Sequence, residues 1–376
     1  MSEHPIREAL RRLARGQDLD EEQAMDSMSA VMEGGLSPML VAAFLMGLRS
    51  KGETVDEIVG CARAIRARSA PFPGARPELV DTCGTGGDGT GTFNISTTAA
   101  FVVAGAGVEV AKHGNRAVSS ATGSADVLEA LGVDVTMNGH EASRALEAAG
   151  ITFLFAPVYH SAMRHASPVR RELAVRTVFN LLGPLCNPAG SGAQVVGVFD
   201  AELVRPVAEA LARLGARRAM VVHGDGGLDE LAVTGPSLVA EWDGSALRER
   251  TVRLDELGLP ARRAAGMRGG SAADNAAIAR AILGDAGAGH DAGLPAGFDL
   301  EAGRDVVVLN AAAALVVAGR AADLRDGMDA ARASIRSGRA LASLQALVDF
   351  SRTVGAGRPV RKVEAAVPAM PAGWGR

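Results

Sequence analysis

The sequence predicts an α/β protein in which a small all-helical N-terminal lobe lies beside a larger α/β lobe with a mainly parallel central sheet. Residues 1–69 carry helical patterns with no strand pattern between them. Beyond them, short apolar runs alternate with alanine-rich helical stretches, which is typical of a parallel sheet flanked by helices. Hydrophobic residues make up 48% of the 376 residues and aromatic residues only 3%, so we expect a large core built from Ala, Val and Leu.

The helices of the N-terminal lobe are marked by start and stop signals. Capping-box spacing, or an N-cap followed by proline, marks three helix starts: Asp20 with Gln23, Ser37 with Pro38, and Thr54 with Glu57. Gly34 and Gly35 end the helix that Asp20 begins. The stretch APFPGARP, residues 70–77, is typical of a linker. We therefore place the helical lobe at residues 1–74.

The larger lobe is expected to span residues 75–350. Five apolar runs are its predicted strands: 79–83, 108–112, 151–156, 195–199 and 219–223. Residues 169–188 instead show one longer helical pattern that ends at Gly183-Pro184, and we expect a segment around 168–186 to complete the helical lobe. Two stretches rich in Gly, Ala and Pro are expected to be a surface loop, 284–297, and a flexible tail, 355–376.

Composition and charge exclude several classes of protein. Lys and Arg number 39 against 43 Asp and Glu, a net charge of -4, which provides no basic field for nucleic acid. Three cysteines, Cys61, Cys83 and Cys186, form no CxxC pair, so we expect a reducing, cytoplasmic location. The N-terminus has no hydrophobic signal core. The longest uncharged run, residues 89–108, contains several Gly, Thr and Asn and is expected to be a loop that leads into a buried helix, not a membrane span.

The stretch GTGGDGTG, residues 84–91, contains five glycines between a predicted strand and a helix that begins near Asn94. In that setting backbone N–H groups converge on phosphate oxygens, and the helix N-terminus adds partial positive charge. The stretch lacks the Gly-Lys-Ser/Thr ending of a Walker A loop and is not a Rossmann fingerprint. It therefore predicts a phosphate site, although a structural turn with positive φ would explain two or three of the glycines.

Two further motifs follow predicted strands. Lys112, His113 and Arg116 lie where ligands bind in doubly wound sheets, with Ser119, Ser120 and Ser124 behind them, and predict a second anion site. A solvated basic turn is the alternative. Asp229 and Glu230 are adjacent and suit Mg²⁺ if they lie beside phosphate, or are solvated charge if they do not. The sequence has no HExxH motif and no nucleophile elbow, so neither zinc nor covalent catalysis is indicated.

Five motifs in a fixed order resemble the anthranilate phosphoribosyltransferase family. They are GTGGDGTGTFNIST, KHGNRAVSSATGSADVLEALG, HSAMRHASPVRRELAVRTVFNLLGPLCNP, DELAVTGPS and LNAAAALVVAGRAADL. The likeness extends from the first helices to about Val348. It implies a glycosyltransferase of tryptophan biosynthesis that transfers the phosphoribosyl group of 5-phosphoribosyl 1-pyrophosphate (PRPP) to the amine of anthranilate, with Mg²⁺ as cofactor.

The resemblance also implies which residues bind each ligand. For PRPP they are Gly84, Gly87, Asp88, Thr92, Asn94, Ile95, Ser96, Thr97, Lys112, His113, Gly114, Asn115, Arg116, Ala117, Val118, Ser119, Ser120 and Ser124. For anthranilate they are Gly84, Asn115, His160 and Arg170, and for the metal Ser96, Asp229 and Glu230. The chain departs from the family at Ala174, where glycine is usual, and the added methyl group is expected to affect the helix that carries Arg170.

These assignments imply a mechanism without an obligatory strong base. Departing negative charge is stabilised by Mg²⁺, Lys112 and the loop amides, while Arg170 holds the anthranilate carboxylate and Asn115 orients its ring. No residue is assigned as a catalytic acid or base with certainty. His113 is the candidate that takes the proton from the amine after its attack.

Two other functions share parts of this pattern. A pyrimidine nucleoside phosphorylase is similar in fold, but the VRREL setting of Arg170 and the KHGNR motif argue against it. A non-catalytic nucleic-acid-binding paralogue should be basic with eroded motifs, whereas this chain is mildly acidic and keeps them. The resemblance further implies a homodimer joined through the helical lobe, where Leu40, Phe44 and Met46 are apolar. Any glutamine amidotransferase partner is a separate chain, because no such motif lies in this sequence.

Overall fold

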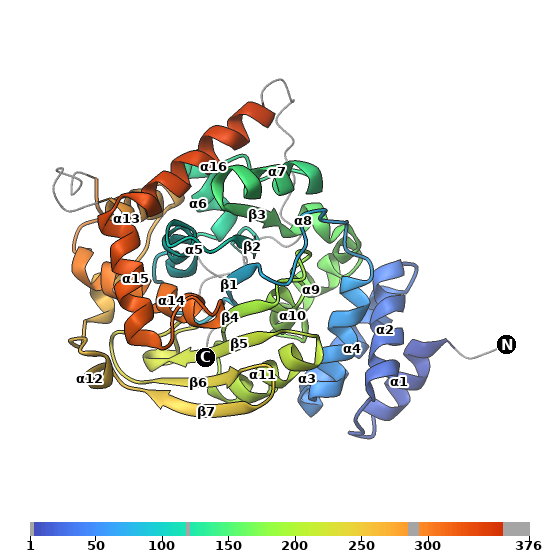
Figure 1. The fold of residues 1–376 in the computed structure, drawn as a ribbon. Coiled ribbons are helices and arrows are strands. Elements are labelled where there is room, and N and C mark those ends of the chain that lie inside the picture. Colours follow the sequence, from blue (N-terminus) through green and yellow to red (C-terminus); the bar gives the residue numbers. More distant parts are fainter. Residues whose placement is uncertain (1–3, 118–120, 285–292, 356–376) are drawn as a thin grey trace.

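A seven-stranded, mostly parallel sheet is the centre of the molecule (Figure 1). The computed structural model describes residues 4–117, 121–284 and 293–355. The strand order is β3-β2-β1-β4-β5-β6-β7. The strands are β1 Val80–Gly84, β2 Val110–Gly114, β3 Ile151–Phe155, β4 Ala193–Gly197, β5 Arg218–Gly224, β6 Ser237–Trp242 and β7 Leu247–Val252. The helical N-terminal region and the α/β region with a mainly parallel sheet confirm the predicted fold class.

The sheet carries an antiparallel hairpin that the sequence did not reveal. β1 to β5 pair in parallel, within about two residues of the predicted runs, whereas β6 and β7 pair antiparallel to their neighbours. Asp243 turns the chain between them, because its Oδ1 accepts the N–H groups of Ser245 and Ala246, both at 2.8 Å. β7 is the edge strand, and its charged, exposed residues 248–250 block pairing with another chain.

Four helices form the N-terminal lobe: α1 Pro5–Leu13, α2 Glu21–Glu33, α3 Pro38–Lys51 and α4 Val55–Arg66. The three predicted helix starts are confirmed, with Asp20, Ser37 and Thr54 as N-caps. Glu57 does more than cap its own helix. It is fully buried, accepts the Leu19 N–H at 2.9 Å and pairs with Lys51 at 2.9 Å. Phe44, one of the three apolar residues named for the dimer interface, is fully buried inside this lobe and adds nothing to its surface.

The remaining helices cover the two faces of the sheet. They are α5 Ile95–Gly105, α6 Ser124–Leu131, α7 Gly139–Ala149, α8 Ala156–Tyr159, α9 Ser167–Leu173, α10 Phe179–Leu185, α11 Val204–Arg213, α12 Leu254–Leu257, α13 Ala272–Leu283, α14 Leu300–Val317, α15 Leu324–Arg336 and α16 Arg339–Gly355. Alternate residues of a strand face opposite sides of the sheet and therefore belong to different hydrophobic cores. Val195 packs with α5 and α14, whereas Val196 packs with α11 and the helical lobe. The helical lobe therefore shares its core with one face of the sheet.

The long helical pattern predicted for residues 169–188 is divided in the structure. Ala174 has φ 50°, the single positive φ of a non-glycine residue in the described chain, and it ends α9. Gly183 and Pro184 do not end the next helix, as we expected, but lie inside α10. α9 contacts α3 and α10 contacts α4. The left-handed conformation at Ala174 costs about 1 kcal/mol for a residue with a Cβ, which explains why glycine suits this position.

The sheet opens between β1 and β2. The two strands pair at Val80 and Val110 and then diverge, whereas β1 keeps its register with β4 along its whole length. Buried polar side chains bridge the opening. Asn187 donates to Asp81 Oδ2 at 2.7 Å and to the Ala111 carbonyl at 2.8 Å, and Asp81 Oδ1 accepts the His113 N–H at 3.1 Å. The ends of β1 and β2 are thus held apart by side chains.

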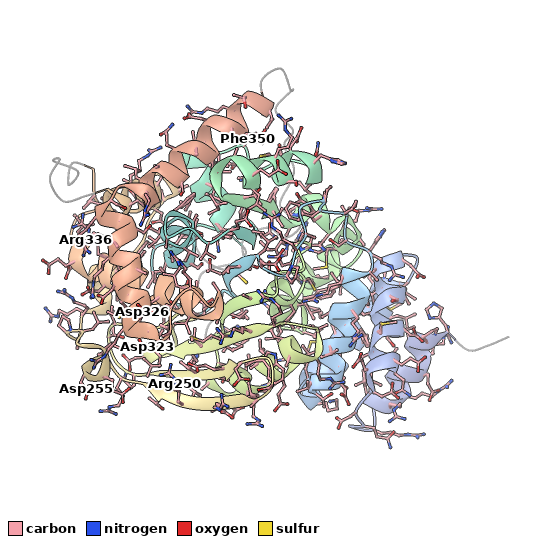
Figure 2. The ribbon with its side chains drawn as sticks, in the orientation of Figure 1. Arg250, Asp255, Asp323, Asp326, Arg336 and Phe350 are labelled. Atoms are coloured by element: carbon pink, nitrogen blue, oxygen red, sulfur yellow. The ribbon has the colours of Figure 1, made fainter. Side chains whose placement is uncertain are left out.

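Charged side chains lie around the rim of the molecule. Figure 2 shows Arg250, Asp255 and Arg336 projecting from its outer edge, with Asp323 and Asp326 at the start of α15. In the part of the chain that the structure describes, no helix is both long and apolar enough to cross a membrane. The predicted flexible tail, apart from Gly355, and most of the predicted surface loop at 284–297 lie outside the described residues.

We predict that Asn187→Ala destabilises the fold by about 2 to 4 kcal/mol, because it leaves the Asp81 carboxylate and the Ala111 carbonyl buried with fewer donors. Thermal unfolding measures the change. The control is Gln345→Ala, at an exposed position of α16, which should leave the midpoint nearly unchanged. Equal midpoints for the two variants would show that the bridge between β1 and β2 does not stabilise the sheet.

Candidate active site

The glycine loop, residues 85–91, joins the end of β1 to α5. Gly86, Gly87, Gly89 and Gly91 all have φ between 67° and 74°. A positive φ therefore accounts for four glycines of this stretch, more than the two or three that we expected from the sequence. Thr85 fixes the start of the loop, because its N–H donates to the Gly197 carbonyl at 2.8 Å and its hydroxyl accepts the Phe199 N–H at 3.2 Å.

Gly84 and Gly197 are required by the close approach of Asp229. A Cβ on Gly84 would lie 2.2 Å from Asp229 Oδ2, and one on Gly197 would lie 1.5 Å from the Asp229 carbonyl oxygen. These two glycines end β1 and β4, the neighbouring strands at which the chain order of the sheet reverses. Ligands bind at such a switch point in doubly wound sheets. Because Gly84 and Gly197 have no Cβ, the Asp229 carboxylate can lie in this crevice.

Asp229 and Glu230 are not solvated surface charge, which was the alternative in our sequence analysis. Both are half-buried, and each accepts a backbone N–H from the opposite side of the crevice: Gly86 to Asp229 Oδ2 at 2.7 Å, and Ser96 to Glu230 Oε1 at 3.0 Å. Burial raises the pKa of Asp229, and the Asp88 carboxylate adds to this effect. Burial and the charge of Asp229 raise the pKa of Glu230, which Lys112 opposes.

The carboxylates fit a divalent cation. Asp88, Asp229 and Glu230 repel one another in a partly desolvated site, and a bound cation would relieve that repulsion. No group of three or more His, Cys, Asp or Glu side chains in the described chain has the arrangement of a complete metal site. A cation with two protein carboxylates and further ligands from phosphate and water is the coordination that Mg²⁺ adopts. The residues present therefore suit Mg²⁺ bound together with a phosphate ligand.

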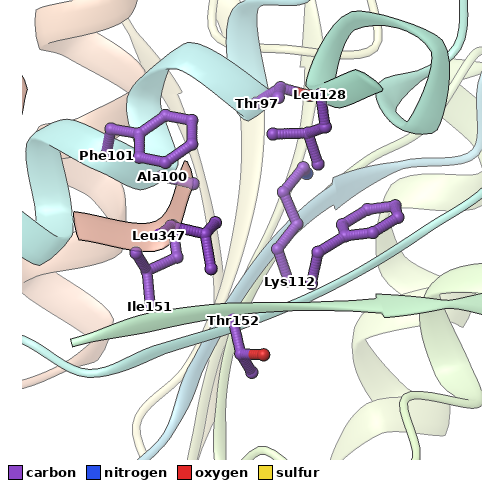
Figure 3. Close-up of a pocket in the computed structure, with 9 residues that line it drawn as sticks. Thr97, Ala100, Phe101, Lys112, Leu128, Ile151, Thr152 and Leu347 are labelled. Atoms are coloured by element: carbon purple, nitrogen blue, oxygen red, sulfur yellow. The ribbon is translucent and has the colours of Figure 1, made fainter. Parts of the chain in front are cut away.

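Lys112 is the buried cation of the site, with 3% of its surface exposed. Figure 3 shows its aliphatic chain rising from β2 toward Thr97 and Leu128, beside a small cavity of about 10 Å³. Its Nζ donates to the Thr82 carbonyl and lies 3.4 Å from Ser96 Oγ. The charge is thereby held at the N-terminus of α5, next to Glu230.

Several of the residues predicted to bind PRPP lie at the start of α5. Asn94 is the residue before the helix, and Ile95, Ser96 and Thr97 form its first turn, where a helix carries partial positive charge. The Ile95 N–H donates to the Phe93 carbonyl at 2.8 Å, and the Ser96 N–H donates to Glu230 Oε1 at 3.0 Å. Asn94 is held by two contacts: its Nδ2 donates to the Thr122 carbonyl at 3.2 Å, and its Oδ1 accepts from Asn275 at 2.8 Å.

The glycine-loop ligands lie near the start of this helix. Asp88 Oδ2 accepts the Thr90 hydroxyl at 2.6 Å, and Thr92 pairs with Arg268 in a short bridge. Asp88, Thr92 and Asn94 are half-buried along this stretch, whereas Phe93, Ile95 and Thr97 are buried.

The second motif folds into a turn between β2 and α6. Gly114 ends β2, and the Asn115 carbonyl accepts the Ser124 hydroxyl at 3.2 Å, which closes the turn. The Arg116 side chain is already engaged, because it pairs with Asp126 at 2.9 Å and with Glu129. The Arg116 guanidinium is therefore already paired with carboxylates of α6. Ala117 follows it, half-buried, while Val118, Ser119 and Ser120 lie outside the described residues.

Two of the predicted anthranilate residues, His160 and Arg170, lie on the α8–α10 side of the crevice, whereas Gly84 ends β1 and Asn115 follows β2. His160 stacks edge-on against His113, with ring centroids 5.1 Å apart, and burial lowers the pKa of both. Arg170 lies over the Phe179 ring at 4.8 Å, and burial lowers its pKa to about 10. No acidic side chain among the described residues pairs with it. A partly desolvated guanidinium of this kind is a receptor for an anion.

The comparisons with known proteins agree with this geometry. The model of the "Glycosyl transferase family, a/b domain" matches residues 76–341, and that of the "Glycosyl transferase family, helical bundle domain" matches residues 7–69. The anthranilate phosphoribosyltransferase of Moorella thermoacetica is 52% identical over 91% of this chain and 97% of its own length. That of Roseiflexus sp. is 53% identical over 93% of this chain and 98% of its own length. The chain belongs to the anthranilate phosphoribosyltransferase family.

Solved structures of this family share the fold. The enzyme of Thermus thermophilus superposes with a TM-score of 0.83 at 45% identity, and the match covers 92% of this chain and 99% of that one. The enzyme of Saccharomyces cerevisiae, solved in complex with PRPP and Mg, gives a TM-score of 0.83 at 27% identity, with 94% and 99% coverage. The likeness therefore includes both regions of the chain.

Sequence reasoning missed several residues that build the site of this family member. Gly197, Asp81, Asn187 and Arg176 support the crevice without belonging to an obvious chemical motif. A signal existed for Arg176, since it lies inside the quoted stretch VRRELAVRTVFN as a lone cation after a helix. Gly197 had no comparable signal, because its role depends on the position of Asp229 in space.

We predict that Gly84→Ala lowers the free energy of unfolding by about 1 to 3 kcal/mol, because the new Cβ overlaps Asp229 and must displace it. Gly183→Ala is the matched control, since its Cβ would meet no atom within 4 Å and it lies in a helix. Thermal unfolding of both variants measures the difference. If Gly84→Ala unfolds at the same temperature as the control, the close approach of Asp229 is not a constraint on this site.

Proposed function

We propose that this chain transfers the phosphoribosyl group of PRPP to the amine of anthranilate and releases pyrophosphate, the reaction for which its family is named. One observation carries the proposal. The glycine loop, the Asp229–Glu230 pair and Lys112 converge at the switch point of the sheet, while Arg170, which has no acidic partner among the described residues, lies on the segment beside it. The site thus offers separate places for a metal-bound diphosphate and for a carboxylate.

Asp229 and Glu230, with the hydroxyl of Ser96, are the residues that would hold Mg²⁺. When bound, the ion neutralises the charge that develops on the departing pyrophosphate. The chain's own groups act on the same charge. Lys112 places a buried ammonium beside Ser96, and the start of α5 adds the partial positive charge of a helix N-terminus.

The second substrate requires orientation more than activation. Arg170 can bind the anthranilate carboxylate through two parallel hydrogen bonds, which directs the amine toward the anomeric carbon. Asn115 sits at the end of β2 with its Nδ2 available, because its Oδ1 accepts the Arg116 N–H. The bond from the anomeric carbon to the pyrophosphate oxygen breaks as the bond to nitrogen forms, and the amine then loses one proton.

His113 is a weak base for that proton. Burial lowers its pKa well below the ordinary value, and the nearby His160 and Lys112 contribute in the same direction. Its Nδ1 lies 3.2 Å from the Gly183 carbonyl, so the proton belongs on Nδ1 and the lone pair on the buried Nε2. A neutral imidazole of this kind can accept a proton from an already acidic ammonium, which is all that the reaction needs.

The direct test is turnover of purified protein with Mg²⁺, anthranilate and PRPP, followed by detection of phosphoribosyl-anthranilate and pyrophosphate. We expect both products in equal amounts, and none when EDTA removes the metal. Phosphorolysis of a pyrimidine nucleoside in the same preparation, without anthranilate turnover, would contradict the proposal and favour the phosphorylase alternative.

Arg170→Ala should raise the KM for anthranilate about tenfold to a hundredfold, the loss expected for a charge-assisted bond of roughly 1.5 to 3 kcal/mol. The KM for PRPP should change far less, because its ligands lie on other elements. Arg171→Ala is the matched control, since the neighbouring side chain is exposed. Steady-state kinetics with each substrate varied in turn gives both values. Equal weakening of both substrates would assign Arg170 a structural role in α9.

The raised pKa values of Asp229 and Glu230 predict that Mg²⁺ binds more tightly as pH rises. Because the pKa values of Asp229 and Glu230 are raised, the metal-free protein keeps protons on this pair at pH values where ordinary carboxyl groups are ionised. Mg²⁺ must displace these protons in order to bind. As the pH rises through the raised pKa values, the protons leave and no longer compete with the metal. The increase in Tm caused by Mg²⁺ should therefore be larger at about pH 8 than at about pH 6. In the double variant Asp229→Asn, Glu230→Gln this difference should vanish. A shift that is independent of pH in the native protein would contradict the metal assignment.

We further propose a homodimer joined through the helical lobe. Met39 is 79% exposed, and it lies on the same side of α3 as Ala43 and Met46, at helical spacing. A groove of about 600 Å³ between α1 and α3 is lined by apolar residues that include Leu10, Ala43 and Met46. An exposed apolar stripe beside an apolar groove supports an interface with a second copy. The cytoplasmic location expected from the sequence stays a prediction.

Light scattering should give the mass of two chains at micromolar concentration. The double variant Met39→Glu, Met46→Glu should give one chain, because two charges would be buried without partners in the interface. Ala342→Glu, on the exposed face of α16, is the control and should remain dimeric. A monomeric mass for the unaltered protein would contradict the proposal.

A further inference from the structure

Arg176 lies in the short segment between α9 and α10, where residues 174–178 cross beside the glycine loop. The turn at Ala174 directs this segment away from the axis of α9. The guanidinium of Arg176 lies 4.0 Å from the centre of the Phe199 ring and donates to the Gly87 carbonyl. The planar group is thus fixed by stacking on one side and used as a donor at its edge.

Three consecutive residues of the loop are held by three different elements. Thr85 is bonded to the chain that follows β4, at Gly197 and Phe199. Gly86 donates its N–H to Asp229. Gly87 is held through its carbonyl by Arg176, whose own position depends on Phe199. The Arg176 contact is the one that connects the loop to the segment that carries Arg170.

The contact fixes the orientation of one peptide. In a trans peptide the carbonyl and the following N–H point in opposite directions. Because Arg176 holds the Gly87 oxygen, the Asp88 N–H points away from Phe199, and no acceptor among the described residues takes it. A free N–H so directed in a glycine loop is a donor for a phosphate oxygen.

We propose that Arg176 is a positioning residue for phosphoribosyl transfer, which orients the Gly87–Asp88 peptide so that its N–H binds the pyrophosphate of PRPP. This inference rests on the proposed function. Burial and the nearby Arg49 of α3 lower the pKa of Arg176, and the carboxylates of Asp200 and Asp88 oppose this shift, which agrees with a partly buried place beside the loop. Arg176 also ties the anthranilate side of the crevice to the PRPP side.

The test compares four proteins by titration with inorganic pyrophosphate and Mg²⁺: the native chain, Arg176→Ala, Arg176→Lys and Phe199→Leu. Arg250→Ala, on the exposed edge strand β7, is the control for loss of one positive charge. Amide hydrogen exchange of residues 85–91 without ligand reports the order of the loop, and steady-state kinetics gives kcat and both KM values. Thermal unfolding checks that each variant is folded.

We expect Arg176→Ala to weaken pyrophosphate binding roughly tenfold, to speed exchange in residues 85–91, and to raise the KM for PRPP while that for anthranilate changes less than about threefold. Arg176→Lys should resemble the Ala variant, because lysine keeps the charge but lacks the planar fork. Phe199→Leu should show a smaller loss in the same direction.

Two results would overturn the proposal. One is pyrophosphate binding by Arg176→Ala within about twofold of the native protein. The other is full recovery by Arg176→Lys, which would show that only the charge matters. If the native protein binds pyrophosphate but does not turn over anthranilate, the proposed function fails while the titrations still decide the role of Arg176.

Discussion

The close contact between Asp229 and the ends of β1 and β4 is the constraint on which the rest of the site depends. Two strands of a sheet lie about 4.8 Å apart, and a chain can lie against both ends only where no Cβ intervenes. Gly84 and Gly197 meet this condition. The contact places the Asp229 carboxylate against the Gly86 N–H, which in turn sets the start of the glycine loop.

The charged side chains of the crevice then determine which ligands it can bind. Asp229 and Glu230 keep raised pKa values because they are half-buried and close together, while Lys112 is fixed between Thr82 and Ser96. Such a site carries negative charge that a divalent cation neutralises and, next to it, N–H donors that suit an anion. Metal and diphosphate are therefore expected to bind together, each reducing the electrostatic cost of the other.

The segment from α9 to α10 carries two arginines with different contacts. Arg170 and Arg176 are six positions apart, yet Arg170 lies over Phe179 and Arg176 donates to the Gly87 carbonyl of the glycine loop. The left-handed turn at Ala174 separates their directions. A backbone irregularity thus gives two arginines of one short segment different tasks, which a continuous helix through these residues would not allow.

The sequence was sufficient for features that are local in the chain. Helix caps such as Asp20 and Thr54, the five parallel strands and the glycine loop all depend on neighbours in sequence. The hairpin of β6 and β7 was missed because residues 248–250 are charged on an edge strand, which hides the apolar alternation. The contacts of Gly197 with Asp229, of Asn187 with Asp81 and of Arg176 with Gly87 join segments that are distant in the sequence, so no local pattern marks them.

The central claim is that the Asp229–Glu230 pair and the glycine loop bind PRPP through a shared Mg²⁺. Isothermal titration of PRPP, with and without Mg²⁺, into the native protein and into the double variant Asp229→Asn, Glu230→Gln tests it most directly. If the claim holds, binding should strengthen at least about tenfold with Mg²⁺ in the native protein and show no such gain in the variant. Equal affinity with and without Mg²⁺, or an unchanged gain in the folded variant, would contradict it.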